Sequence, residues 1–365
     1  MMKIGIIDAD LIGRKQHRFP NLACMKISGY HKERNDTVIF LESYELLDKF
    51  DRVYISKVFT DTPVPDHVLE RKNVVYGGTG FYFDNAPPLP EEIEHSKPDY
   101  TLYNQFVRGK PKSEVKFYTD YSIGFLTRGC FRKCKFCVNQ KYDRVVKASP
   151  LSEFYDPDRK KICLLDDNFL GFPDWESLIE ELRATGKPFR FHQGLDERIL
   201  TDRKCKWLFS SKYDGDITFA FDDVADYKLI EKKLKMIRRH TDKQIRFYVL
   251  CAFDRNNEYD SEFWKQDFED IFERVDLLTK HKAIPYLMRF EAYENAPIDI
   301  KGMYITLARW VNQPSFFKRY TVFEYIEKLT DNGERSPAKY LDGFRTLYPD
   351  LVERWFNRHF WEVDK

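Results

Sequence analysis

Three cysteines, Cys130, Cys134 and Cys137, lie within eight residues at the spacing C-x3-C-x2-C. So short a loop can turn three sulfurs toward one centre, and thiolate is the ligand that soft metals prefer. A cubane iron–sulfur cluster normally takes four cysteines, and no fourth cysteine follows nearby. The spacing therefore predicts a [4Fe–4S] site with one iron left open, as at metal centres that do chemistry.

Two other interpretations of this loop stay open. A zinc-stabilised binding module without turnover would need a distant fourth ligand, and zinc sites more often combine C-x2-C pairs with a second pair or with H-x3-H. Three unligated thiols are the other alternative. Cys24, Cys163, Cys205 and Cys251 are scattered, as expected of buried apolar side chains. Seven cysteines in total argue against a disulfide framework and for a reducing cytoplasm.

The loop follows an apolar run, residues 121–126, that predicts a strand. The order C-x3-C-x-aromatic-C, carried by Cys130, Cys134, Phe136 and Cys137, resembles the signature of the radical S-adenosylmethionine (radical SAM) superfamily. The resemblance covers residues 120–295. It implies that S-adenosylmethionine binds the open iron and is reductively cleaved to a 5′-deoxyadenosyl radical, which abstracts hydrogen from a substrate that the sequence does not identify. Cys251 is then a candidate hydrogen donor to the substrate radical.

The elements around the loop alternate between strand and helix. Helical patterns cover residues 175–184 and 226–240, and apolar runs predict strands at residues 121–126, 161–165, 189–191, 217–221, 245–252 and 284–290. Strand–helix alternation favours a parallel α/β sheet. We therefore expect an incomplete (β/α)6 TIM-like barrel over residues 120–300, with function at the carboxyl ends of its strands. A helical extension is expected over residues 301–365.

Polar side chains gather where these strands end. The resemblance implies that Asp166, Asp167 and Asn168 hold the ammonium group of S-adenosylmethionine, a charge-assisted contact, and that Phe136 lies against the adenine. Each Asp or Asn is alternatively a helix cap. The residues expected to be catalytic are Asp166, Asp167, Gln193 and Cys251, and those expected to bind cofactor also include Arg198, Asp222, Asp223 and Arg289, with Asp222 or Asp223 on the ribose hydroxyls.

Residues 1–86 predict a smaller doubly wound domain. Its expected strands are residues 3–8, 37–41, 52–59 and 73–76, with short helices at residues 44–50 and 66–71. The strand order and residues 74–78 resemble the Rossmann-like, cobalamin-binding-type domain that precedes many radical SAM barrels. The cobalt-ligating D-x-H-x-x-G of that domain is missing after the first strand. Cobalamin is therefore not favoured, and a cobalamin-dependent radical SAM methyltransferase is the alternative function.

Two further stretches of this domain have two interpretations each. The turn at residues 77–80 is Gly-Gly-Thr-Gly, and the stretch at residues 8–21 is unusually polar. Both follow strands at the edge where parallel sheets bind ligands. A tight structural turn and a solvated loop explain them equally well. Residues 87–119, rich in Pro, Glu, Lys and Ser, predict a linker to the barrel.

Charge and hydropathy limit the classes of partner that the sequence predicts. With 60 basic and 59 acidic residues, the chain has no overall field to attract nucleic acid or an anionic membrane. No apolar run approaches a membrane span, and the start of the chain does not resemble a secretion signal. Residues 128–147 carry seven basic residues against one acidic. This rim is either a solvated loop or a surface for an anionic substrate or for an electron donor such as flavodoxin or ferredoxin.

Overall fold

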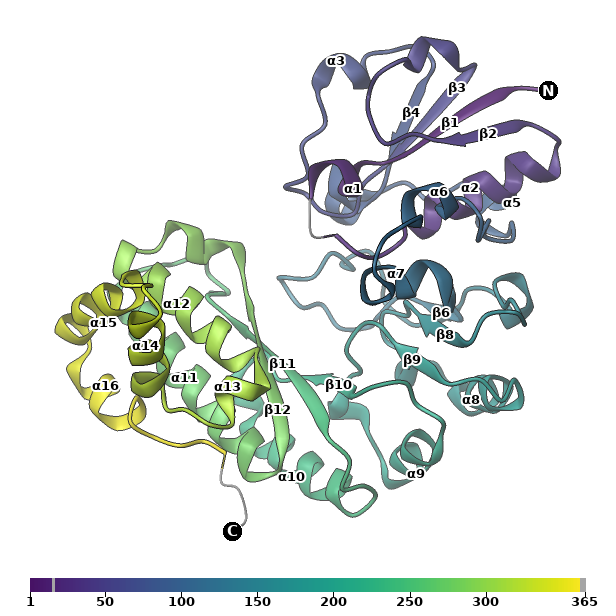
Figure 1. The fold of residues 1–365 in the computed structure, drawn as a ribbon. Helices are drawn as coiled ribbons and strands as arrows, with labels where there is room; N and C mark the ends of the chain where they lie inside the picture. The colour runs from purple at the N-terminus through teal and green to yellow at the C-terminus, as the bar shows by residue number, and fades with distance from the viewer. Residues whose placement is uncertain (15–16, 362–365) are drawn as a thin grey trace. The chain divides into compact units, whose positions relative to one another are not determined.

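The computed structural model describes residues 1–14 and 17–361 and shows a mixed α/β protein with parallel sheets (Figure 1). The chain divides into two compact units, Met1–His192 and Gln193–Lys365. This boundary falls inside the segment of residues 120–300 that was predicted to form one barrel. The domain boundaries expected near residues 86, 119 and 300 stay predictions.

The first unit begins with a four-stranded parallel sheet in the order β2-β1-β3-β4. The central strand β1 has five fully buried residues in succession, as expected of a strand covered on both faces. All four strands lie within a few residues of the predicted positions. They are β1 (Lys3–Asp8), β2 (Thr37–Phe40), β3 (Arg52–Ser56) and β4 (Val74–Gly77).

A twelve-residue helix that the sequence pattern did not reveal, α2 (Leu22–Glu33), runs along one face of this sheet (Figure 1). Its buried side includes polar residues, which obscured the helical periodicity. Lys26 pairs with Glu94 at 2.8 Å, and Ser28 donates a hydrogen bond to Asp99 at 2.6 Å. The helix predicted over residues 44–50 was wrong in extent, since only the 3-10 turn Leu47–Lys49 forms there. The short helices are α1 (Ala9–Gly13), α3 (Asp66–Leu69) and α4 (Thr79–Tyr82).

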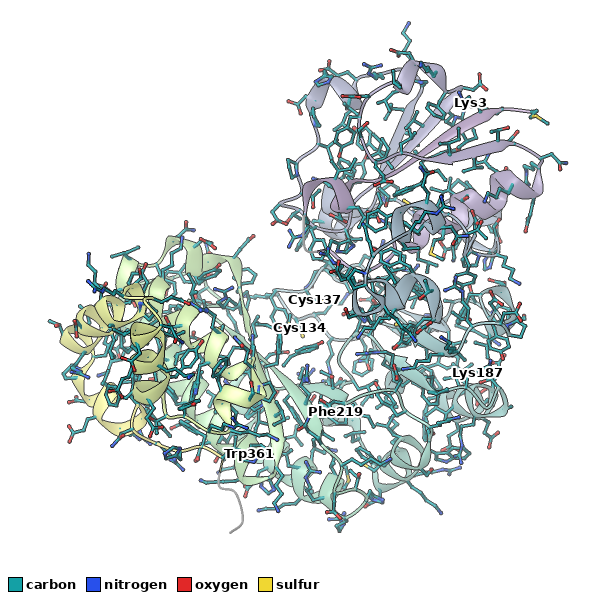
Figure 2. All side chains as sticks on the ribbon, in the orientation of Figure 1. Lys3, Cys134, Cys137, Lys187, Phe219 and Trp361 are labelled. Carbon is teal, nitrogen blue, oxygen red and sulfur yellow. The ribbon has the colours of Figure 1, made fainter. Side chains whose placement is uncertain are left out.

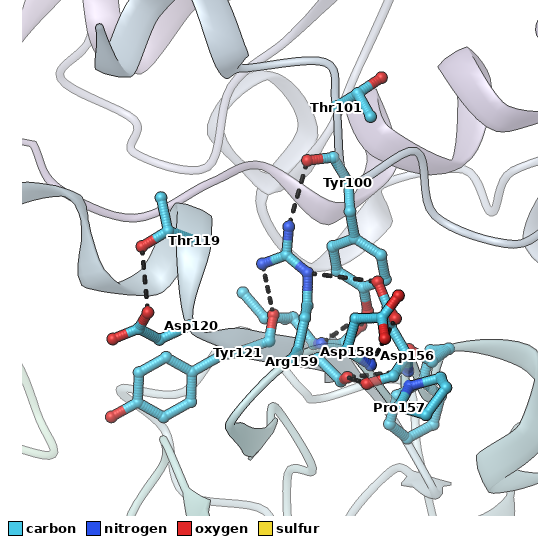
Figure 3. A network of polar contacts seen from close by, with 12 residues as sticks. Tyr100, Thr101, Thr119, Asp120, Tyr121, Asp156, Pro157, Asp158 and Arg159 are labelled. Carbon is cyan, nitrogen blue, oxygen red and sulfur yellow. Dashed lines mark hydrogen bonds and ion pairs between the residues drawn. The ribbon is translucent and has the colours of Figure 1, made fainter.

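Residues 87–119, predicted as a linker, lie within the first unit and pack into it. They form α5 (Glu91–Glu94), α6 (Asn104–Val107) and α7 (Lys112–Thr119). Tyr103 is buried, and its hydroxyl donates to Asp8 Oδ2 at 3.0 Å. Arg159 donates to the carbonyl oxygens of Tyr100 and Tyr121 at 3.1 and 3.0 Å, which ties this segment to the next sheet (Figure 3).

The second sheet of the first unit is parallel, in the order β5-β8-β9. A two-stranded antiparallel pair, β6 (Thr127–Arg128) with β7 (Val146–Lys147), follows its first strand and closes the base of the cysteine loop. One longer helix, α8 (Trp175–Ala184), lies where the apolar spacing predicted it. The strands of the sheet are β5 (Tyr121–Gly124), β8 (Lys161–Leu164) and β9 (Phe189–Phe191).

The second unit contains a parallel sheet, β10-β11-β12, and most of the long helices. All six strands predicted for the barrel are therefore present, in two three-stranded sheets, one in each unit; their closure into one (β/α)6 barrel stays a prediction. The elements are β10 (Ile217–Ala220), β11 (Ile245–Cys251), β12 (Ala283–Arg289), α9 (Asp202–Ser210), α10 (Tyr227–Arg238) and α11 (Ser261–Lys280).

Helices fill most of residues 298–355, as the pattern of residues 301–365 predicted, and aromatic side chains of this segment pack on α11. Phe268 of α11 stacks on Tyr304 with 4.3 Å between ring centroids, and Phe272 stacks on Trp355 at 5.6 Å. No helix in the described part of the chain has both the length and the apolar character needed to cross a bilayer. The C-terminal helices are α12 (Ile298–Val311), α13 (Pro314–Phe317), α14 (Val322–Asp331), α15 (Ser336–Leu347) and α16 (Pro349–Trp355).

Candidate functional site

The cysteine loop leaves the second sheet through β6 and returns through β7. It begins at Gly129, whose φ of +92° is in the region that favours glycine. A Cβ at this position would lie 2.5 Å from the Arg144 carbonyl oxygen, so the two sides of the loop approach too closely for a side chain. Cys134 and Cys137 both lie on this loop (Figure 2). The sharp entry thus turns the cysteine stretch away from the strand.

Amide groups point at the sulfurs of Cys130 and Cys137. Cys130 Sγ accepts hydrogen bonds from the Arg132 N–H and from Asn168 Nδ2, each at 3.3 Å. Cys137 Sγ accepts one from the Asn139 N–H at 3.5 Å. Such donors stabilise thiolate charge and tune the potential of iron–sulfur clusters. This donor set therefore fits thiolate ligands of a cluster.

The thiols are also electrostatic neighbours. Burial raises the pKa of Cys137, and the charges of Cys134, Cys130 and Asp167 raise it further. A positive centre bound among them would remove that repulsion. In residues 1–14 and 17–361, no three His, Cys, Asp or Glu side chains are already gathered at metal-binding separation. Holding a cluster would therefore require the cysteine side chains to turn together.

Asp167 ties the two ends of the cysteine stretch to each other. Its Oδ2 accepts a hydrogen bond from the Gly129 N–H at 2.7 Å, and its Oδ1 accepts one from Asn139 Nδ2 at 2.9 Å. Asn139 was not singled out from the sequence, although a polar residue two positions after the last cysteine is a natural place for such a bond. The predicted contact of Asp167 with S-adenosylmethionine stays a prediction.

Asp166 lies beneath the loop and is almost completely buried. Its Oδ1 accepts hydrogen bonds from the N–H and the hydroxyl of Thr127, both at 2.6 Å, and its Oδ2 accepts one from the Leu126 N–H at 3.2 Å. Burial raises the pKa of Asp166 to about 7, against these hydrogen bonds, which lower it. The carboxyl group therefore holds the chain at the entrance to the loop, and its predicted catalytic role stays a prediction.

Part of the basic rim serves the loop itself. Lys133 Nζ donates to the carbonyl oxygens of Gln140 and Tyr142 at 2.7 and 2.6 Å and pairs with Asp143 at 2.6 Å. Such exposed pairs contribute little stability individually, but three contacts from one ammonium group join distant parts of the loop. Phe136, the residue expected against the adenine, is half-buried on the same loop.

The predicted residues of the second unit are mostly engaged with their own neighbours. Gln193 is exposed at the start of the unit. Arg198 Nε pairs with Asp196 at 2.8 Å. Burial raises the pKa of Asp222 to about 6, opposed by the positive charge of Arg274. The second unit therefore offers a half-buried carboxyl group at the end of β10.

Three further residues of this unit have clear local roles. Asp223 accepts a hydrogen bond from the Ala225 N–H at 2.9 Å, which is the helix-cap alternative noted from the sequence. Arg289 is exposed, with its guanidinium 4.5 Å from the centre of the Tyr293 ring. Cys251 is 1% exposed, and its thiol donates to the Met288 carbonyl oxygen at 3.5 Å. Hydrogen donation by Cys251 to a substrate stays a prediction.

Glu197, a residue that the sequence did not single out, is the buried acid next to Arg198. Its Oε2 accepts a hydrogen bond from the Ala220 N–H at 3.1 Å, and Arg198 Nε lies 3.8 Å from its Oε1. Burial raises the pKa of Glu197 from 4.5 to about 8, and the charge of Asp196 adds to the shift. A carboxyl group in this environment is protonated near neutral pH.

We expect Glu197→Gln to flatten the pH dependence of stability. Because the folded-state pKa is raised, the folded state binds more protons than the unfolded state between about pH 4.5 and 8. The contribution of protonated Glu197 to the free energy of unfolding is therefore fully present below this range and is lost as pH rises through it. Glutamine keeps an acceptor for the Ala220 N–H and cannot ionise. The variant should gain melting temperature relative to wild type as pH is raised from 5 to 8, by about 2–4 °C for each kcal/mol. Parallel melting curves across this range would contradict the shift.

Two features of the first domain bear on cobalamin binding: the glycine turn after β4 and His17. The glycines of the turn after β4 are needed against the chain itself, since a Cβ on Gly78 would lie 2.3 Å from the Lys57 carbonyl oxygen and one on Gly80 would lie 2.6 Å from that of Phe59. This supports the structural interpretation of the turn. His17 packs edge-on against Phe59, and burial lowers its pKa. Cobalamin binding by this domain, possible but not favoured from the sequence, stays untested.

Comparison with known proteins gives structural matches alone. No family model and no curated protein matches the sequence. Among solved structures, the chain is similar to the cobalamin-dependent S-adenosylmethionine radical enzyme OxsB with aqua-cobalamin and S-adenosylmethionine bound, at 13% identity and a TM-score of 0.46, over 84% of this chain and 55% of that one. An apo structure of the same enzyme matches at 13% identity and a TM-score of 0.37, over 80% and 49%. The chain thus spans about half the length of OxsB.

Proposed function

We propose that this chain is a radical SAM enzyme in which Cys130, Cys134 and Cys137 hold a [4Fe–4S] cluster. The observation that carries the proposal is the C-x3-C-x2-C loop at the carboxyl end of the first strand of a parallel sheet, with amide donors directed at Cys130 and Cys137. When bound, such a cluster supplies the electron that cleaves S-adenosylmethionine to methionine and a 5′-deoxyadenosyl radical, which abstracts hydrogen from the substrate.

The chain's own residues would shape the loop and seat the ligand. Asp166 and Asp167 hold the loop at its entrance and across its two ends. Asn168 fixes Cys130 through its side-chain amide. Phe136, on the same loop, is proposed to pack against the adenine of S-adenosylmethionine. These contacts restrain the backbone of the loop, so that binding a cluster would mainly require the three cysteine side chains to turn toward one centre.

The cofactor-binding roles of Asp222 and Arg289 and the catalytic role of Gln193, all in the second unit, stay predictions. Exposed basic residues of the loop suit an anionic substrate or an acidic electron donor such as flavodoxin or ferredoxin. Nothing in the proposed chemistry requires cobalamin.

The test is anaerobic turnover of purified, cluster-reconstituted protein with S-adenosylmethionine and dithionite, with and without hydroxocobalamin. We expect 5′-deoxyadenosine and methionine in equal amounts, unchanged by the corrinoid, because the radical forms without it. The products are quantified by liquid chromatography, and the control is the same protein before reconstitution.

Two results would change the assignment. A corrinoid spectrum that survives gel filtration, with S-adenosylhomocysteine as the main product, would establish the methyltransferase alternative. Absence of S-adenosylmethionine cleavage by protein that carries a complete reduced cluster would overturn the proposed function.

A further inference from the structure

His192 follows β9 directly, at the same sheet edge as the cysteine loop and Asp167. Its N–H donates to the Leu164 carbonyl oxygen at 2.8 Å, which continues the pairing of β9 with β8. The imidazole stacks on Phe19 with 4.4 Å between ring centroids and 25° between planes, and Phe117 meets its edge at 5.6 Å. Two aromatic rings therefore fix the orientation of this side chain.

Strand register places His192 on the face of the sheet that carries the buried side chains of Ile123 and Cys163. Arg190 pairs with Cys163 of β8, and Cys163 pairs with Ile123 of β5, so these residues share one face. His192 is two residues beyond Arg190 and continues that row. Phe19 belongs to the polar stretch of residues 8–21, so the residue of that stretch that stacks on His192 is aromatic rather than charged.

The two ring nitrogens of His192 are in different environments. Nδ1 is buried and has no hydrogen-bond partner, whereas Nε2 is not among the buried, unpartnered atoms of the described residues. A buried N–H without an acceptor is rarer in proteins than a buried acceptor without a donor. The proton therefore belongs on Nε2, and the ring presents Nε2–H as a donor at the sheet edge. Burial and the charge of Arg190 lower the pKa of His192 to about 4, so the ring stays neutral.

We propose that His192 Nε2–H donates a hydrogen bond to an oxygen of S-adenosylmethionine, its carboxylate or a ribose hydroxyl, at the carboxyl edge of the β5-β8-β9 sheet. The inference rests on the proposed function, because it names the ligand of that site. A neutral donor of fixed tautomer recognises an oxygen acceptor without adding positive charge beside a sulfonium.

Calorimetry of S-adenosylmethionine binding to anaerobic, cluster-loaded protein tests the inference. His192→Phe retains an aromatic ring for Phe19 and Phe117 and removes the donor, so we expect the dissociation constant to rise about tenfold, with the cluster spectrum unchanged. His192→Gln offers an amide N–H in place of Nε2–H and should recover part of the loss. His95→Phe makes the same exchange at an exposed histidine that pairs with Glu153 and should bind as wild type.

A second measurement determines the tautomer of the His192 ring directly. Long-range ¹H–¹⁵N spectra of ¹⁵N-histidine-labelled, cluster-free protein should show the His192 signals, identified by their loss in His192→Phe, as the Nε2–H tautomer at pH 7. The Nδ1–H tautomer, or equal ligand affinity of His192→Phe and wild type, would overturn the assignment to His192 alone. Failure of wild-type, cluster-loaded protein to bind S-adenosylmethionine would instead overturn the proposed function together with this inference.

Discussion

Replacing any one of Cys130, Cys134 and Cys137 by alanine is expected to abolish a cluster of about four iron and four sulfide per chain. Each thiolate is one of three protein ligands, so a single loss leaves two irons without a protein ligand instead of one. Iron and sulfide analysis of anaerobically reconstituted protein, with electron paramagnetic resonance of the reduced sample, measures the result.

Cys205→Ala is the matched control for the cysteine variants. Cys205 is buried in α9 of the second unit and belongs to no cysteine motif. The Cys205→Ala variant should therefore keep the full iron content despite the loss of a thiol. Stoichiometric zinc in active, cluster-free protein purified without oxygen would contradict the iron–sulfur assignment and restore the zinc alternative.

Asp167→Ala should weaken cluster retention, and this effect is the second largest we expect. The change removes both hydrogen bonds that join Gly129 to Asn139 across the cysteine stretch. Residues that orient metal ligands typically change metal affinity by 10–100-fold, so iron loss to a chelator should be about tenfold faster or more. Asp167→Asn keeps one acceptor oxygen and should lie between the alanine variant and wild type.

Asp143→Ala is the control on the same loop, because Asp143 is exposed and contributes one surface ion pair to Lys133. Such exposed pairs contribute little to stability, so iron release should match wild type. If Asp167→Ala instead retains iron normally but binds S-adenosylmethionine weakly, the carboxylate contacts the ligand ammonium group, as the family resemblance implies, and the loop does not depend on it.

Sequence patterns were sufficient for the ten strands of the parallel sheets, but not for the short pair β6 and β7. The six apolar runs after residue 120 and the four before residue 86 all appear as strands within a few residues of the expected positions. The apolar character of such strands shows in the local sequence, most clearly in buried strands such as β1, β5 and β8. The helix α2 was missed because its buried face includes Lys26, Ser28 and Gly29, whose partners at residues 94–99 are distant in sequence.

The cysteine motif and its place after a strand were determined by the sequence alone, because residue type and spacing are local properties; the chemistry of the motif stays a prediction. Tertiary structure decided the rest. It showed that Asp166 bonds to the Thr127 N–H just before the loop, that Asp167 bonds to the Gly129 N–H, and that residues 87–119 pack within the first unit. It also set His192 between Phe19 and Phe117, with one nitrogen buried. Burial and hydrogen-bond partners come from residues far apart in the chain, so no local pattern could supply them.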